Sequence, residues 1–194
     1  MAYSRKAVEE LAAAMIYSGK GWRRGEKLTH PAEYYAHHCE KSIGWKNLAV
    51  DANGARAPWD EIGAIDYAGI DRDSVLAVKE FFVGLYERRP FTIGQLTSSR
   101  HVEGSYHLKH VMEKLRRIVG DGIGKDENGF PRDGYVSNGE FIIGYTLFLA
   151  DFMLCDSRTI RKIFTRSETA PNVFCRLPAT FSALERYLND RRAI

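Results

Sequence analysis

The fold is decided by residues 137–154, which read SNGEFIIGYTLFLADFML. Ser137 and Glu140 have the spacing of a capping box, in which each side chain satisfies a backbone N–H at the first turn of a helix. The apolar run that follows, from Phe141 to Cys155, is too short to span a bilayer. We therefore expect a buried helix over residues 138–154 at the centre of a soluble protein.

Several other segments carry apolar residues at helical spacing. The helices expected from this spacing cover residues 4–19, 31–41, 73–88, 93–98, 105–119 and 157–166, and a last one starts near residue 179. Glycine and proline punctuate residues 44–72, which predicts irregular structure with a short helix near 59–65. Val173 to Cys175 is a candidate strand.

These elements predict a mainly α fold, a compact multi-helix bundle with at most a short β element. We expect an N-terminal helical region at residues 1–70, which is a candidate subdomain, and a helical core at residues 71–194. A length of 194 residues with 44% hydrophobic and 27% charged residues is typical of a globular protein that buries a core.

The cysteines and the N-terminus favour a cytoplasmic protein. The three cysteines are widely spaced and contain no C-x-x-C pair, so neither a disulfide framework nor a thiolate zinc site is indicated. No apolar segment of the secretory type follows the basic residues near Met1. The net charge of +3 is mildly basic, which permits nucleic-acid binding without requiring it.

The middle of the chain resembles a helix-turn-helix. A helix at 73–88 precedes a short helix at 93–98, and a six-residue turn then leads to the basic helix at 105–119, although three or four residues are usual for this turn. The basic helix offers donors for base edges and cations for phosphates. These residues are His107, Lys109, His110, Lys114 and Arg117. The alternative is a solvated basic face on an ordinary amphipathic helix.

Two further segments combine basic residues in a way that could contact phosphate. The short helix after Asp156 carries Arg158, Arg161 and Lys162, and the buried helix could place it on one surface with the basic helix at 105–119. The loop from Gly19 to Lys27 carries Trp22 beside Arg23 and Arg24, which could stack on a base or bind phosphate. Such loops are more often solvated, with the tryptophan folded onto the core.

Metal and cofactor sites are weakly indicated, and none is predicted. His30, Glu33 and His37 could supply zinc ligands, but a site would need a further ligand such as His101 or Cys39, and single histidines more often serve packing. Residues 133–140 match only the second half of an EF-hand loop. Residues 120–125 have the wrong spacing for a P-loop.

Two segments carry a resemblance to known proteins. GSYHLKH at 104–110 and YVSNGEFI at 135–142 resemble short patterns in small uncharacterised proteins of phages and other mobile elements. The resemblance covers the middle third of the chain, and residues 120–132 depart from its compact form. It implies a protein that acts in a bacterial cytoplasm, and it carries no activity or catalytic residue.

The sequence therefore favours a non-enzymatic binding protein that acts on nucleic acid or on a nucleoprotein complex of the host. One alternative is an inhibitor of a host defence complex, similar to anti-CRISPR proteins, which would bind a protein surface through exposed aromatic anchors. The candidate anchors are Tyr34, Trp45, Trp59 and Tyr67. A second alternative is a metal-dependent enzyme built around His30 and His37. No recognisable nucleophile motif favours an enzyme.

Overall fold

The computed structural model describes residues 27–56, 65, 67–118, 135–166 and 171–181, with the backbone alone at 88 and 115–118. Several predicted segments lie outside these ranges. They are the helix at 4–19, the helix at 59–65 except for residue 65, the loop with Trp22, Arg23 and Arg24, residues 120–134, and the final helix beyond residue 181.

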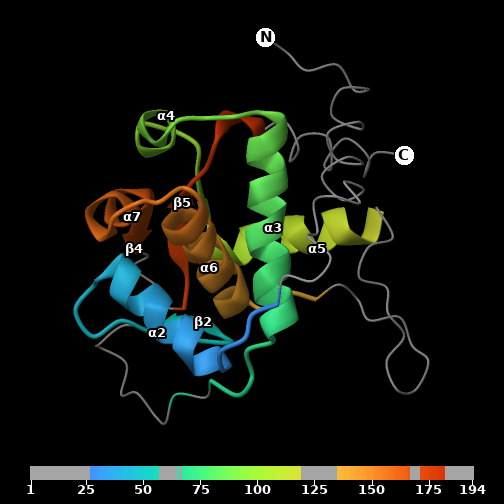
Figure 1. Ribbon diagram of the computed structural model, residues 1–194, viewed down its shortest axis with the longest axis vertical. Helices are drawn as coiled ribbons and strands as arrows, with labels where there is room; N and C mark the ends of the chain where they lie inside the picture. The colour runs from blue at the N-terminus through green and yellow to red at the C-terminus, as the bar shows by residue number, and fades with distance from the viewer. Residues whose placement is uncertain (1–26, 57–64, 66, 119–134, 167–170, 182–194) are drawn as a thin grey trace.

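Helix α6 (Asn138–Leu147) lies at the centre of the described structure, as the sequence predicts (Figure 1). All ten of its residues are buried, and Ser137 and Glu140 form the predicted capping box. Helix α3 (Arg72–Arg88) crosses α6 at Gly144, where an added Cβ atom would lie 2.6 Å from both the Val75 carbonyl oxygen and the Val78 Cβ. Glycine at position 144 is therefore what lets the two helices pack this closely.

The predicted helix over 138–154 changes its hydrogen-bonding pattern after Leu147. Residues Phe148–Phe152 form a π-helical turn, η1, after which the Met153 N–H donates to the Phe148 carbonyl oxygen. The Phe148 ring stacks on Tyr145 and on Phe152, with centroids 6.1 and 5.6 Å apart. The helix ends before Leu154, whose φ of 54° lies in the left-handed region. A π turn inserts a residue into the helix, which an apolar pattern alone does not reveal.

Helix α2 (Ala32–Ile43) covers the predicted helix at 31–41 and packs against α6, where the Cys39 thiol donates to Thr146 Oγ1 at 3.2 Å. The segment predicted to be irregular contains an antiparallel hairpin of β1 (Ala49–Asp51) and β2 (Gly54–Arg56). Gly54 has a φ of 133°, which its lack of a side chain allows. Residues from α2, β1, α3 and α6 belong to one hydrophobic core.

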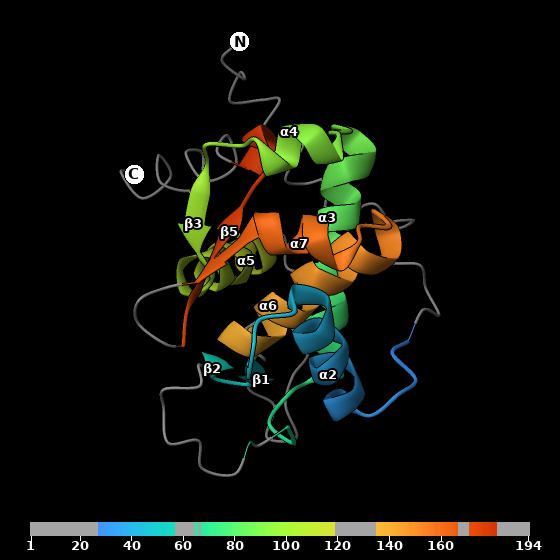
Figure 2. The same ribbon diagram turned by 90° about the vertical axis from the view of Figure 1, so that its left-hand side faces the viewer.

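A three-stranded antiparallel sheet connects the remaining helices. Its strands β3 (Val102–Gly104), β4 (Phe164–Arg166) and β5 (Val173–Arg176) lie in the order β3-β5-β4. Helix α5 (Ser105–Ile118) follows β3 directly, and α7 (Ser157–Ile163) leads directly into β4, so the two helices adjoin opposite edges of the sheet (Figure 2). The mainly α fold and the strand at 173–175 are confirmed, and the described residues hold more β structure than the sequence predicts.

The structure does not show a helix-turn-helix at residues 73–119. Thr92 and Gln95 form the predicted capping box and begin α4 (Ile93–Thr97). The predicted turn after α4 instead contains β3, which pairs with β5, and α4 packs against α7. The physical reason is that residues 102–104 find backbone partners far along the chain, which holds the segment extended. Among the described residues, no helix combines the length and apolar character needed to cross a membrane.

Candidate nucleic-acid interface

Helix α5 carries the basic residues predicted to contact nucleic acid, but Lys109 is only 4% exposed. Its Nζ atom lies 3.2 Å from Glu113 Oε1. The rings of Tyr106 and Tyr135 flank the ammonium group, with centroids 5.0 and 4.7 Å from Nζ. Lys109 therefore neutralises a buried carboxylate, and the prediction that it lies on an exposed basic face is wrong.

The carboxylate of Glu113 is the centre of this buried cluster. Its Oε2 atom lies 2.7 Å from His110 Nδ1, and its Oε1 atom accepts a hydrogen bond from the Val136 N–H at 3.3 Å. Burial raises the pKa of Glu113, but the bonds from His110 and Val136 and the charge of Lys109 outweigh burial and hold that pKa below its usual value. The cluster thus joins α5 to the segment before α6.

The other α5 residues that were predicted to contact nucleic acid differ in how far they are exposed to solvent. His107 is exposed, whereas His110 and Lys114 are partly exposed. The side chain of Arg117 lies outside the described part of the structure. Because Lys109 and His110 both engage Glu113, α5 presents fewer free donors to solvent than its helical spacing predicts.

Helix α7 presents its cations to solvent, as the sequence predicts. Arg158, Arg161 and Lys162 are all exposed, whereas Ile160 and Ile163 are buried. At 100° per residue the three basic residues lie on the face opposite the isoleucines. Arg161 also donates from Nε to the Ile43 carbonyl oxygen at the end of α2. Within the described ranges, the side chains of Arg158 and Lys162 form no hydrogen bond or ion pair.

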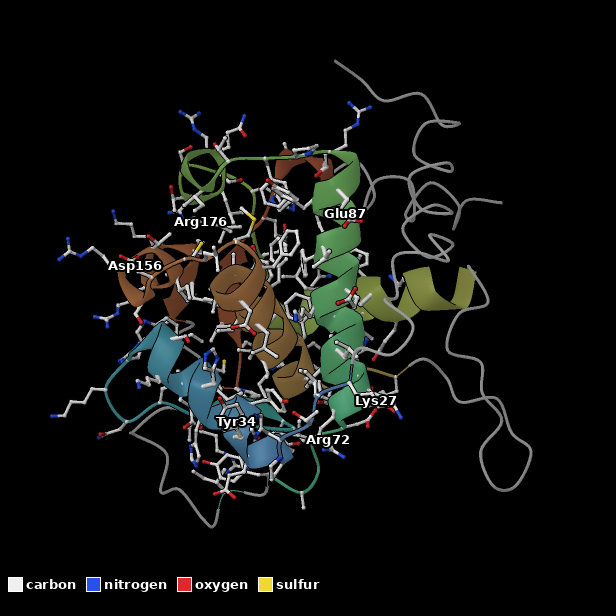
Figure 3. The ribbon with its side chains drawn as sticks, viewed as in Figure 1. Lys27, Tyr34, Arg72, Glu87, Asp156 and Arg176 are labelled. Carbon is white, nitrogen blue, oxygen red and sulfur yellow. The ribbon has the colours of Figure 1, made fainter. Side chains whose placement is uncertain are left out.

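Arg176 connects α7 to the segment after α4. Its Nε atom donates to the Lys162 carbonyl oxygen at 3.1 Å, and its Nη1 atom donates to the Ser99 carbonyl oxygen at 2.5 Å. One guanidinium therefore holds the last turn of α7 beside the loop that carries Arg100. Figure 3 shows Arg176 and Asp156 together on this side of the molecule, with Lys27 and Arg72 across from them.

A cavity of about 570 Å³ opens between α4 and the segment at 177–181. Exposed Arg89 and Arg100 contribute to its lining, together with the buried Leu96 and Thr180. These two arginines and Arg176 were not among the residues predicted from the sequence to contact nucleic acid. The sequence does carry a signal for this group of cations, since arginines lie on both sides of the short capped helix, at 88–89 and at 100.

The structure brings the predicted basic residues together only in part. The cations of α7 lie beside the cavity at α4, because α4 packs against α7. Helix α5 adjoins the other edge of the sheet, so the two basic helices do not form the single surface that the sequence suggested (Figure 2). Nothing can be added for Trp22, Arg23 and Arg24, which lie outside the described ranges.

Among the residues considered as zinc ligands, His37 and Glu33 engage each other and Cys39 is buried. His37 lies between two carboxylates, with Nδ1 2.8 Å from Glu40 Oε2 and Nε2 3.4 Å from Glu33 Oε1. The hydrogen bond with Glu40 raises the pKa of His37 above its usual value. Burial raises the pKa of the Cys39 thiol to about 12. No group of three or more potential ligands occurs among the described residues.

The aromatic anchors considered for a protein partner do not share one exposed patch. Tyr34 is 49% exposed. Trp45 and Tyr67 are partly buried against the core, and their outer parts engage Arg166 and Glu40. Trp59 lies outside the described ranges. Tyr34 is therefore the one largely exposed ring among the three of these anchors that the structure describes.

Comparison of the chain with protein-family models, with curated proteins and with solved structures gives no match.

Proposed function

We propose that this protein binds nucleic acid through a cationic surface formed by α7 and the segments that flank α4. This α4–α7 surface consists of Arg89, Arg100, Arg158, Arg161 and Lys162, all of which are exposed. The observation that carries the proposal is the bridge from Arg176 to the Ser99 and Lys162 carbonyl oxygens, since it fixes the two groups of cations side by side.

The chemistry of the α4–α7 surface suits a phosphate backbone. The exposed cations of Arg158 and Lys162 can neutralise phosphates without first breaking an ion pair in the described part of the structure. Exposed carboxylates on the adjoining elements are Asp156 at the start of α7, Asp151 on η1 and Glu87 near the end of α3, so the five cations of the surface outnumber them. The partner is free nucleic acid or a nucleoprotein complex, in the host-cell setting of a phage or another mobile element.

This proposal changes the interface that the sequence favoured. The proposed interface is formed by α7 and the segments that flank α4, and not by α5. The reasons are that Lys109 is buried against Glu113 and that α5 lies at the other edge of the sheet. A protein that reads DNA with a recognition helix would need an exposed row of donors on that helix. The proposed contacts are therefore to phosphates rather than to base edges in a groove.

The test compares two variants that each remove two positive charges. The α7 variant combines Arg158→Gln with Lys162→Gln and removes two positive charges from the outer face of α7. The control variant combines Lys27→Gln with Lys114→Gln and removes two positive charges that lie outside the α4–α7 surface. Fluorescence anisotropy with a labelled oligothymidylate and a labelled duplex gives the affinities at low salt. We expect the α7 variant to lose about tenfold and the control variant to change little.

Equal losses in the two variants would show that binding follows overall charge and not the α4–α7 surface. A loss confined to the Lys27 and Lys114 variant would place the interface elsewhere. Either result would overturn the proposal. Both variants change exposed or partly exposed side chains, so their thermal midpoints should match that of the unmodified protein.

A further inference from the structure

We infer that the cavity at α4 binds a single unpaired nucleotide, with the base inside the cavity and the phosphate held by Arg89 and Arg100. This inference rests on the proposed nucleic-acid function and names the form of ligand that the α4–α7 surface takes. The cavity volume of about 570 Å³ lies within the range of pockets that enclose small organic ligands, about 300–1,000 Å³.

The walls of the cavity are held in place by hydrogen bonds that do not depend on a ligand. The Ser99 hydroxyl donates to the Leu177 carbonyl oxygen at 2.7 Å, and the Leu177 N–H donates to the His101 carbonyl oxygen at 3.0 Å. On the α4 side, the capping box of Thr92 and Gln95 fixes the first turn. A cavity that is already formed costs little conformational entropy when a ligand binds.

The lining combines the two kinds of surface that a nucleotide needs. Phe91, Leu96 and Pro178 supply apolar surface for a flat ring, since base stacking on aromatic side chains tolerates any base. Arg89 and Arg100 supply cations for a phosphate. An inorganic anion would leave the apolar wall unused, and an uncharged apolar ligand would leave the arginines unused. A base that carries a phosphate uses both.

One polar side chain in the lining can engage the edge of a base. Gln95 uses Oε1 to accept from the Thr92 N–H, which leaves its amide hydrogens for a ligand.

The cavity also lies where a bound strand would reach it. Arg176 bonds to Ser99, which lines the cavity, and to Lys162 of α7, so the two regions are adjacent. A strand that follows the cations of α7 through its phosphates can therefore place one unstacked base in the cavity. This arrangement favours single strands over duplexes, because a paired base is not available to enter.

The test blocks the cavity without changing its charge. Ala179 is exposed and lines the cavity, so Ala179→Trp fills the space. Ala68→Trp is the matched control, because Ala68 is also exposed. Ala68 precedes the first residue of α3, whereas α4 and the cavity lie after the last residue of α3.

The probes are an oligothymidylate, thymidine monophosphate and inorganic phosphate, each measured by titration calorimetry. We expect Ala179→Trp to weaken oligothymidylate binding about 5- to 100-fold, which is the range for loss of one base contact, and Ala68→Trp to leave it unchanged. Thymidine monophosphate should bind more tightly than inorganic phosphate, and Ala179→Trp should remove that difference.

Unchanged oligothymidylate affinity in Ala179→Trp would overturn the inference, while a loss in the α7 variant would still support the proposed function. Equal binding of thymidine monophosphate and inorganic phosphate would also overturn it, because the base would then contribute nothing. Binding of the mononucleotide without any binding of the oligothymidylate would identify a site for free nucleotides, and it would reject the strand-binding function alone.

Discussion

Replacement of Lys109 by methionine should destabilise the protein without weakening nucleic-acid binding. The side chain is 4% exposed, and its ammonium group lies 3.2 Å from Glu113 Oε1. Methionine retains much of the length and apolar bulk of lysine but leaves the Glu113 carboxylate without its closest positive charge. The substitution therefore separates a structural role for Lys109 from the phosphate-binding role that the sequence suggested.

The size of the effect follows from the partners that remain. Breaking a fully buried ion pair by removing one partner costs about 3–5 kcal/mol. Glu113 keeps His110 Nδ1 at 2.7 Å and the Val136 N–H at 3.3 Å, so its carboxylate is not left without partners. We therefore expect Lys109→Met to lower the free energy of unfolding by about 2–3 kcal/mol, which is just below that range.

The assay is denaturation by urea, followed by circular dichroism, with Lys114→Met on the same helix as the control. The expected result is a lower midpoint at an unchanged slope, which indicates a loss of stability alone. A change below about 0.5 kcal/mol, which is ordinary for a surface substitution, would refute the buried ion pair. Reduced nucleic-acid affinity in a fully folded Lys109→Met protein would restore α5 as the interface.

The same variant has a predicted pH dependence. The pKa of Glu113 is lowered in the folded protein from its ordinary value of 4.5. A lowered pKa means that this carboxyl stabilises the fold above pH 4.5, and that the contribution is lost as the pH falls through the lower folded-state pKa. Lys109→Met raises the folded-state pKa, so the dependence of stability on pH in that acidic window should become weaker. An unchanged acid profile would contradict the coupling.

Three further predictions concern the core, the thiols and α7. Gly144→Ala should lower the free energy of unfolding by about 1–2 kcal/mol, because overpacking outweighs the higher helix propensity of alanine, and a more stable variant in urea denaturation would contradict this. The thiols, including Cys39 with a pKa raised to about 12, are buried, so Ellman's reagent should label the folded protein only as fast as it opens. Asp156→Asn keeps the cap that accepts the Thr159 N–H but removes a negative charge beside the cations, so it should bind oligothymidylate more tightly at an unchanged thermal midpoint. Unchanged affinity there would count against α7.

The sequence predicted the parts of the fold that local interactions determine. Both capping boxes, at Thr92 and at Ser137, depend on residues three positions apart, and both are formed. The hairpin at 49–56 was missed because its strands are only three residues long and because its turn, Ala52-Asn53, is not one of the residue pairs typical of two-residue hairpin turns. The pairing of β3 with β5 joins distant segments, and no local pattern predicts it.

In the candidate site too, local patterns were predicted from the sequence and contacts between distant segments were not. Helical spacing correctly placed Arg158 and Lys162 opposite the buried isoleucines of α7. It failed for Lys109, because whether a lysine faces solvent depends on what covers it, and here Tyr135 from another segment does so. The cavity at α4 depends on contact between that helix and residues 177–181, which only the folded chain brings together.

The salt dependence of binding tests the central claim most directly. The affinity of the unmodified protein for oligothymidylate should fall linearly on logarithmic axes as salt rises, because neutralised phosphates release counterions. For single strands each lost phosphate contact reduces the magnitude of the slope by about 0.7, so the Arg158→Gln and Lys162→Gln variant should lose roughly 1.4 from it. A slope equal to that of the unmodified protein would show that α7 does not contact phosphates, and it would contradict the proposed interface.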